Sequence, residues 1–342
     1  MRPMQIQKNY PLKALNSFGV AVTADLFTKL TSSADIDQLI QWRKDNPDTD
    51  CLLIGGGSNM LFRDDFKGLA VAVCLEGREQ VTEDNANYYV KSAAGENWHE
   101  FVRWTIDQGY AGLENLSLIP GTVGAAPMQN IGAYGVELAD RLHSLSAVDL
   151  HTGERREFSN EACQFAYRDS FFKSQQPDRW LIESVTFRLA KTPEWVTAYA
   201  GVEAALEGQT PNARLISDTI IALRQSKLPD PNVIGNAGSF FKNPIMPITQ
   251  WEALKAEFPT IPGYPQKENG ELIKTSAGWL IDQCQWKAFR EGDAGVYEKH
   301  ALVLVNHGEA SGAELWGLAE EIIASVKDKF GVVLENEPRL IA

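Results

Sequence analysis

The 342-residue chain has few of the residues that build metal sites or disulfide frameworks. Its four cysteines, at positions 51, 74, 163 and 284, form no C-x-x-C pair, and its five histidines show no metal-ligand spacing. This pattern indicates neither a zinc site nor a disulfide scaffold. We expect reduced thiols and no bound metal.

The chain also lacks a long apolar run and an excess of positive charge. No segment approaches about 18 consecutive apolar residues, and the N-terminal segment contains no apolar signal-peptide core. With 32 Lys and Arg against 45 Asp and Glu, the net charge is −13. That charge argues against nucleic acid or an anionic membrane as the main partner. We expect a cytoplasmic protein.

No internal repeat or low-complexity tract is present, and the length allows two or three domains with sizeable cores. Apolar periodicity predicts short strands and amphipathic helices in both halves, which indicates an α+β fold rather than a regular βαβ alternation. The expected strands are 51–54, 71–75, 88–92, 145–150, 155–158, 180–189 and 332–341, and the expected helices are 97–108, 214–227 and 314–330.

Two Gly-rich stretches stand out. Gly55-Gly-Gly-Ser-Asn59 follows a predicted strand, so its backbone N–H groups could form a nest for a diphosphate or a plain structural turn. It does not match G-x-G-x-x-G, because position 60 is Met, and no Walker A sequence occurs, so a Rossmann domain is not supported. Ile119–Pro127 and Gln129–Gly135 suit either a backbone wrapped around a large flat ligand or a packed core loop.

The segment Gly235-Asn-Ala-Gly-Ser-Phe-Phe-Lys-Asn-Pro244 combines flexible glycines with the donors Ser239, Lys242 and Asn243. It is typical of a ligand-binding turn or of a tight surface turn before a proline. Lys227 ends the predicted helix 214–227, where it would bind a ligand or cap the helix dipole.

Two further segments contain charged residues of interest. Arg168 lies among aromatic residues, and its planar guanidinium would clamp a carboxylate or phosphate, or pair structurally with Asp169. In a terminal strand, Glu335, Glu337 and Arg339 would share one face by the period of two. That face is either solvent-exposed or places Glu337 beside a catalytic centre.

Together these segments resemble the UDP-N-acetylenolpyruvoylglucosamine reductase family, in the subtype with a mobile tyrosine loop. The resemblance runs from Asn16-Ser-Phe-Gly19 to Glu337-Pro-Arg339. Five motifs occur in the family's order, namely Gly55–Leu61, Ile119–Gly124, Tyr167–Ser170, Gly235–Pro244 and Glu335–Arg339. The segment Gly278–Gln283 supports the match. It implies an enzyme of peptidoglycan synthesis with one non-covalent FAD and NADPH as reductant.

The resemblance also implies the domain plan. We expect an FAD-binding portion of the vanillyl-alcohol-oxidase (PCMH) type, made of two α+β subdomains, and a separate α+β substrate-binding domain. The FAD-binding region would cover 14–190, joined by the C-terminal strand 332–342. A boundary and substrate loop would cover 191–225, and the substrate-binding domain 226–331.

The family match assigns the site residues. Hydride would pass from NADPH to flavin N5 and then to C3 of the enolpyruvyl group, with Ser239 donating the proton to C2. Arg168 and Glu337 would bind or polarise the carboxylate, Glu337 only if it is protonated or shares a proton. The implied substrate-binding residues are Tyr167, Tyr199, Lys227 and Asn243. The implied FAD-binding residues are Gly55, Gly56, Gly57, Ser58, Asn59, Met60, Pro120, Gly121, Thr122, Gly124, Ala125, Gln129, Ile131, Gly132, Tyr134, Gly135 and Ile182.

Two positions depart from the family pattern. The sequence around Tyr199 only partly follows the family's mobile loop, and Pro338 removes an N–H beside Glu337 where a β-branched residue is commoner. Two alternatives stay open on the residues alone. One is an alcohol oxidase with the same flavin fold, although no His lies in either Gly-rich segment to tether FAD. The other is a non-catalytic nucleotide-sugar-binding protein.

Overall fold

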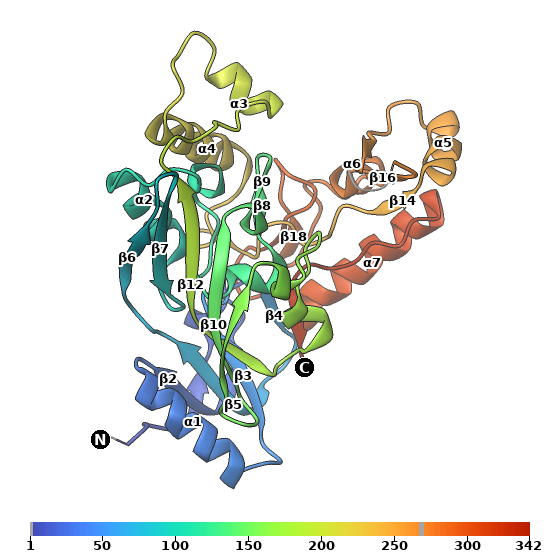
Figure 1. Ribbon diagram of the computed structural model, residues 1–342. Coiled ribbons are helices and arrows are strands. Elements are labelled where there is room, and N and C mark those ends of the chain that lie inside the picture. The colour runs from blue at the N-terminus through green and yellow to red at the C-terminus, as the bar shows by residue number, and fades with distance from the viewer. Residues whose placement is uncertain (1–2, 267–269) are drawn as a thin grey trace. The chain divides into compact units, whose positions relative to one another are not determined.

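The computed structural model describes residues 3–266 and 270–342 (Figure 1). The chain forms two compact units, and the polypeptide passes between them more than once. Unit 1 contains the chain up to Pro11, Thr23–Gly57 and Phe66–Ser226, and unit 2 contains Leu12–Val22, Ser58–Asp65 and the chain from Lys227 onwards. Both units contain helices and strands, in agreement with the predicted α+β class.

Unit 1 begins with a four-stranded sheet in the order β1-β2-β5-β3. Its strands are β1 (Gln7–Pro11), β2 (Thr23–Leu30), β3 (Asp50–Ile54) and β5 (Phe66–Val73). β5 pairs in parallel with both β2 and β3, whereas β1 is antiparallel to β2. Helix α1 (Ser33–Asp45) buries Ile36, Leu39 and Ile40 in a cluster with apolar side chains of this sheet.

The second sheet of unit 1 is antiparallel throughout, in the order β11-β10-β12-β7-β6 (Figure 1). Its strands are β6 (Arg78–Glu83), β7 (Asn87–Ala93), β10 (Leu142–Asp149), β11 (Arg155–Ser159) and β12 (Trp180–Ala190). Helix α2 (Trp98–Asp107) is capped by the side chain of Asn97 and buries Trp98, Phe101 and Val102 in the same cluster as this sheet. Burial of each such side chain stabilises the unit by roughly 1.5–3 kcal/mol.

The rest of unit 1 comprises shorter elements and two further helices. These are β8 (Gly132–Ala133), β9 (Val136–Glu137), α3 (Ala200–Ala205), α4 (Ala213–Lys227), the 3-10 turns Glu114–Leu116, Ala126–Gln129, Leu138–Asp140 and Glu161–Cys163, and the π turn Phe171–Gln175. Polar bonds connect α4 to α2 and its neighbourhood. Arg103 donates to Asp218 Oδ1 at 2.6 Å, Arg214 pairs with Asp107, and the hydroxyls of Ser117 and Ser217 lie 2.8 Å apart.

In its described residues, unit 2 is built from short strands and three helices. One sheet has the order β13-β19-β18-β17 and another β14-β16-β15, while β4 and β20 form a parallel pair. The strands are β4 (Met60–Phe62), β13 (Gly235–Asn236), β14 (Ile245–Pro247), β15 (Tyr264–Pro265), β16 (Leu272–Lys274), β17 (Arg290–Glu291), β18 (Ala294–Val296), β19 (Leu304–Asn306) and β20 (Arg339–Ile341), with the 3-10 turn Lys13–Leu15. The helices are α5 (Ile248–Glu257), α6 (Ala277–Gln283) and α7 (Gly312–Phe330).

The predicted helices and most of the predicted strands are confirmed. Helix α7 begins at a capping box formed by Ser311 and Glu314, and it ends at Gly331 in the left-handed conformation that glycine adopts without strain. The hairpin turn between β10 and β11 likewise has Gly153 at φ +84°.

The predicted terminal strand 332–341 is wrong over most of its length, because β20 covers only Arg339–Ile341. Upstream of it, Asn336 forms an isolated bridge with Phe241, and the N–H of Glu337 donates to Phe240 O at 2.8 Å. Downstream, Arg339 pairs with β4 instead. The change of partner occurs at Pro338, which has no N–H for a ladder. Glu335, Glu337 and Arg339 therefore do not share one face of a single strand.

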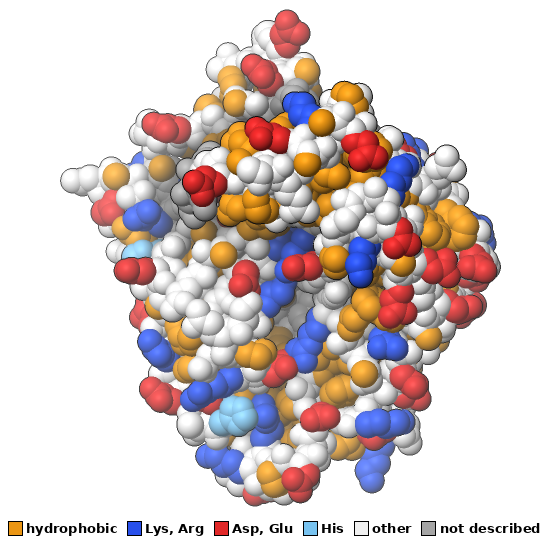
Figure 2. Space-filling model, turned by 90° about the vertical axis from the view of Figure 1, so that its right-hand side faces the viewer, with side chains coloured by type: hydrophobic (Ala, Val, Ile, Leu, Met, Phe, Trp, Pro, Cys, Tyr) orange, Lys and Arg blue, Asp and Glu red, His pale blue; other side chains and the backbone are white. Residues whose placement is uncertain are grey.

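Acidic and basic side chains are interspersed over the face shown in Figure 2. On this face, the chain's excess of Asp and Glu is not gathered in one patch. Within residues 3–266 and 270–342, no helix is long and apolar enough to cross a membrane. The same residues contain no group of three or more His, Cys, Asp or Glu side chains that could hold a metal ion.

Candidate functional site

The two Gly-rich stretches of unit 1 lie against each other. A Cβ added at Gly56 would lie 2.6 Å from Gly121 Cα, and one added at Gly55 would lie 2.6 Å from Thr122 Oγ1. Gly57 has φ +61°. Only glycines allow this approach of two backbones, so the sequence leaves peptide groups rather than side chains around the turn that follows β3. Such a turn fits an anion such as the FAD diphosphate.

The second stretch is attached to the start of α2 by backbone bonds. The N–H of Trp98 donates to Gly121 O at 3.0 Å, and the N–H of Gly124 donates to Ala94 O at 2.9 Å. A Cβ at Gly124 would lie 2.4 Å from Ala94 Cβ. The small residues at 121–125 thus serve close packing here as well as exposing backbone. The structure therefore shows close packing of this segment, and its contact with a ligand stays a prediction.

The loop 129–135 is held by buried amides that sequence reasoning missed. Asn115 is 1% exposed and donates to Tyr134 O at 2.9 Å and to Val196 O at 2.8 Å. Asn130, also 1% exposed, adopts φ +45° and donates to Glu137 Oε2 at 2.8 Å. A polar residue at this burial must be hydrogen-bonded. Each of these asparagines follows a polar residue, Glu114 or Gln129, so the local sequence gave no signal that it is buried.

Arg168 lies beside the same loop. Its Nη2 donates to Gly132 O at 3.3 Å, and its guanidinium lies 5.3 Å from the centre of the Tyr167 ring. Arg168 has φ +55°, a conformation that costs a non-Gly residue energy and often marks functional sites. Asp169 accepts from the N–H of Ser170 and the hydroxyl of Ser174, so its bonds hold the turn together.

In unit 2, Ser239 lies in a turn that is fixed on both sides. Before it, a Cβ at Gly235 would lie 2.1 Å from Phe18 O, and the N–H of Asn236 donates to Ser17 O at 2.9 Å. After it, Phe240 is fully buried and its N–H donates to Leu302 O at 2.7 Å. The turn is therefore held from 17–18 and from 302 without using the Ser239 hydroxyl.

The segment containing Glu337 lies next to this turn. Phe240 O accepts from the N–H of Glu337, so Glu337 is bonded to the residue that follows Ser239. Asn59 joins them, because its Nδ2 donates to Glu337 O at 3.3 Å and its carbonyl accepts from the N–H of Arg339 at 3.0 Å. Lys242 pairs with Glu335 at 3.0 Å. Unit 2 thus brings Asn59, Ser239 and Glu337 together from three distant parts of the sequence.

The predicted substrate-binding residues are distributed over both units. Asn243 Oδ1 accepts from the N–H of Ala277 at the start of α6, and Lys227 is the last residue of α4. Tyr199 is 54% exposed and its ring lies 5.3 Å from that of Tyr134, edge to face. Burial raises the pKa of the Tyr134 hydroxyl above the ordinary value for a phenol.

Two of the predicted FAD-binding residues, Met60 and Ile182, are buried in strands. Met60 is buried in β4 opposite Arg339, and Ile182 is buried in β12 as part of the sheet's core cluster. The contact of Ile182 with FAD stays a prediction.

Comparison with known proteins identifies the family. A family model described as "UDP-N-acetylenolpyruvoylglucosamine reductase, C-terminal domain" matches residues 230–341, and one described as "FAD binding domain" matches residues 24–159. The reductase of that name from Paraburkholderia xenovorans is 50% identical over 334 residues, which cover 96% of each chain. The chain belongs to the UDP-N-acetylenolpyruvoylglucosamine reductase family.

Other relatives agree. The reductase of Pseudomonas aeruginosa is 48% identical over 340 residues, covering 98% of this chain and 99% of that one. The crystal structure of the Thermus caldophilus reductase covers 99% of this chain and all of its own with a TM-score of 0.68 at 22% identity, which shows that the fold is shared. The predicted family, its flavoprotein fold and its FAD cofactor are confirmed, and neither alternative function is favoured.

Proposed function

We propose that this chain catalyses the NADPH-dependent reduction of UDP-N-acetylglucosamine enolpyruvate to UDP-N-acetylmuramate, a cytoplasmic step of peptidoglycan synthesis. The observation that carries this proposal is the near-full-length identity to UDP-N-acetylenolpyruvoylglucosamine reductases, together with the FAD-binding domain. We propose that the enzyme works as a monomer on two small molecules, NADPH and the UDP-sugar.

The glycine turn supports FAD binding through the backbone. Gly55, Gly56 and Gly57 would direct peptide N–H groups at the diphosphate, and loop 129–135 would lie along the flavin ring. FAD supplies the means to accept hydride from NADPH and pass it to C3 of the enolpyruvyl group. The remaining chemistry, binding of the carboxylate and protonation of C2, falls to side chains of this chain.

Arg168 would bind the substrate carboxylate, where negative charge grows as hydride arrives at C3. Its guanidinium is permanently charged and forked, and its backbone is already held in an unusual conformation. A donor fixed before the reaction needs no reorganisation in the transition state. Glu337 would contact the same carboxylate when it carries or shares a proton.

Ser239 would donate the proton to C2. Serine is a weak acid, so the role requires neighbouring charges that stabilise the alkoxide or a water that restores the proton. Its support is the rigid turn, in which both flanking segments are held by backbone bonds and the hydroxyl is not needed for the fold. Tyr167, Tyr199, Lys227 and Asn243 would bind the rest of the UDP-sugar.

The test separates the two half-reactions by stopped-flow absorbance. Ser239→Ala should leave reduction of bound FAD by NADPH nearly unchanged. It should slow reoxidation by the enolpyruvyl sugar by roughly 10²–10⁴-fold, which is the usual contribution of general acid catalysis. Ser226→Ala, an exposed serine on α4, is the matched control and should behave as the parent. If Ser239→Ala reoxidises at the parent rate, Ser239 is not the proton donor.

A further inference from the structure

Arg168 lies at the tip of a tight turn whose conformation needs support. Ala166 and Asp169 exchange two backbone hydrogen bonds, each of 3.1 Å, which leaves Tyr167 and Arg168 between them. Arg168 has φ +55°, in the left-handed region that disfavours residues with a Cβ. Such a conformation persists only where neighbouring groups hold it. Groups around the turn must therefore fix the backbone of Arg168.

Two side-chain bonds attach the ends of this turn to the neighbouring loop. Asn130 Nδ2 donates to Ala166 O at 3.2 Å, and Ser170 Oγ donates to Met128 O at 2.7 Å. All of these residues belong to unit 1. Both bonds act outside the tip, so neither of them fixes the peptide group that follows Arg168.

Lys173 provides a bond to that peptide group. Its Nζ donates to Arg168 O at 3.0 Å. A hydrogen bond from an ammonium group is charge-assisted and about twice as strong as one between neutral groups. A lysine usually keeps its ammonium in water and loses side-chain entropy when it is fixed. The bond therefore restrains the ψ angle of Arg168, and with it the conformation from which the guanidinium extends.

The π turn Phe171–Gln175, which contains Lys173, is anchored in the core of unit 1. Phe172 is 1% exposed and packs edge to face on Phe158, with 5.0 Å between the ring centres. π turns are rare and often occur at functional sites. The ammonium of Lys173 is thus presented to Arg168 by a segment that is itself held in place.

We propose that Lys173 is a positioning residue for Arg168, and that its ammonium holds the backbone conformation that directs the guanidinium at the substrate carboxylate. The proposal rests on the proposed function in one respect, namely that Arg168 binds that carboxylate. A group that meets developing charge is effective only when its geometry is set before the reaction. Loss of the ammonium should therefore slow hydride transfer to the UDP-sugar and leave reduction of FAD by NADPH unchanged.

The experiment is a double-mutant cycle on the FAD-loaded protein, followed by stopped-flow absorbance. The rate constant for reoxidation of reduced flavin by saturating enolpyruvyl sugar is measured for the parent, Lys173→Met, Arg168→Gln and the double variant. Reduction by NADPH and affinity for FAD are measured for each protein as well. Lys173→Arg keeps a cationic donor, and Lys67→Met is the control, since the Lys67 side chain in β5 of the same unit is 73% exposed. Lys173→Gln, with a shorter and neutral side chain, replaces Lys173→Met if that variant does not fold.

We expect Lys173→Met to slow reoxidation by about 10- to 100-fold, because a misplacement of about 1 Å at a positioning group costs up to about 10²-fold. Its reduction by NADPH and its affinity for FAD should equal those of the parent. Lys173→Arg should recover most of the rate, and Lys67→Met all of it. In the Arg168→Gln background, Lys173→Met should cause no further loss, since the group through which it acts is gone.

Three results would overturn the proposal. They are a parent-like reoxidation rate in Lys173→Met, an undiminished further loss in the Arg168→Gln background, and equal slowing of both half-reactions, which would make Lys173 merely structural. Failure of the proposed role of Arg168 is recognisable separately, because Arg168→Gln would then reoxidise at the parent rate. A slow Arg168→Gln beside a parent-like Lys173→Met contradicts only the inference about Lys173.

Discussion

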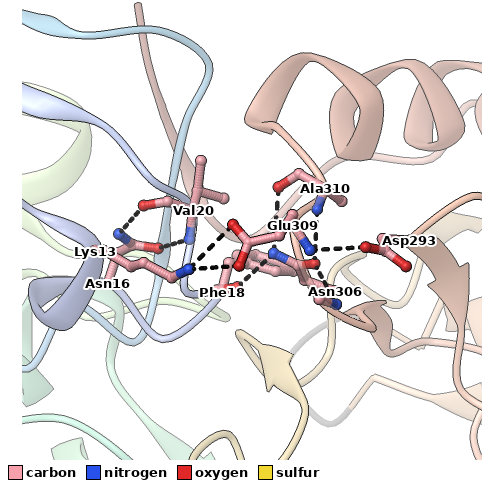
Figure 3. A network of polar contacts seen from close by, with 9 residues as sticks. Lys13, Asn16, Phe18, Val20, Asp293, Asn306, Glu309 and Ala310 are labelled. Atoms are coloured by element: carbon pink, nitrogen blue, oxygen red, sulfur yellow. Dashed lines mark hydrogen bonds and ion pairs between the residues drawn. The ribbon is translucent and has the colours of Figure 1, made fainter.

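Replacing Asn306, which belongs to the polar network drawn in Figure 3, by Ala should strongly destabilise unit 2. Asn306 is 4% exposed, and its side chain makes four hydrogen bonds (Figure 3). Nδ2 donates to Phe18 O at 3.0 Å and to Ala310 O at 3.2 Å, while Oδ1 accepts from the N–H groups of Gly308 and Ala310, both at 3.0 Å. The amide thus joins β19 to segment 308–310, which precedes α7, and to segment 12–22.

The expected cost follows from these bonds. At about 1 kcal/mol for each, the four together give about 4 kcal/mol, because alanine leaves buried backbone groups without partners. That value lies in the tail of the distribution for single substitutions. Lys13→Ala is the matched control in the same network. It removes an ion pair with Glu309 in which the side chains of Lys13 and Glu309 are 48% and 76% exposed. Such a pair contributes about 0–1 kcal/mol.

The assay is equilibrium unfolding in urea, followed by tryptophan fluorescence. Asn306→Ala should lower the free energy of unfolding by about 4 kcal/mol, and Lys13→Ala by less than about 1 kcal/mol. Because Phe18 and Ser17 support the turn before Ser239, the alanine variant should also bind the UDP-sugar more weakly. A loss below about 1 kcal/mol for Asn306→Ala would refute the view that this amide holds the N-terminal segment in place.

Three further predictions address the site and its pH dependence. Gly56→Ala should weaken FAD binding at least about tenfold in a fluorescence titration, because the close approach of Gly121 leaves no room for a Cβ. Gly317 has open space around it, so Gly317→Ala should bind FAD as the parent does. Equal FAD affinities in the two variants would contradict this reasoning. Arg168→Lys should lower kcat/KM at least about a hundredfold with FAD affinity unchanged, because an ammonium lacks the fork, and near-normal turnover would make Arg168 structural. Burial lowers the pKa of His99, so its contribution to stability is complete above its ordinary pKa of about 6.5 and is lost as pH falls through the lower folded value. His99→Asn, which keeps an acceptor for Leu118, should therefore lose less stability in urea between about pH 7.5 and 5, and a parallel loss would exclude His99 as the cause.

Local patterns predicted much of the fold. The stripe of apolar residues in 314–330, with Gly331 after it, could be read directly as a helix and its C-cap, and that is what α7 shows. The short apolar run at 51–54 predicted β3, and the glycines behind it predicted a turn that exposes backbone. In both cases the signal lies within a few neighbouring residues.

Long-range pairing could not be predicted from the same patterns. The alternation in 332–341 is typical of a strand, but the chain changes partner at Pro338, from segment 240–242 to β4. The bonds between Asn59 and the Glu337 segment join residues 278 positions apart, and no local property of either indicates the other. Asn115 is similar, since its significance lies in its burial and in backbone partners that only the folded chain defines.

The most direct test of the central claim is an anaerobic absorbance titration of the purified protein with its flavin. NADPH should bleach the flavin band, and addition of UDP-N-acetylglucosamine enolpyruvate without oxygen should restore it in stoichiometric amount. A band that NADPH bleaches but that returns only when air is admitted would contradict the claim that this chain reduces the enolpyruvyl sugar.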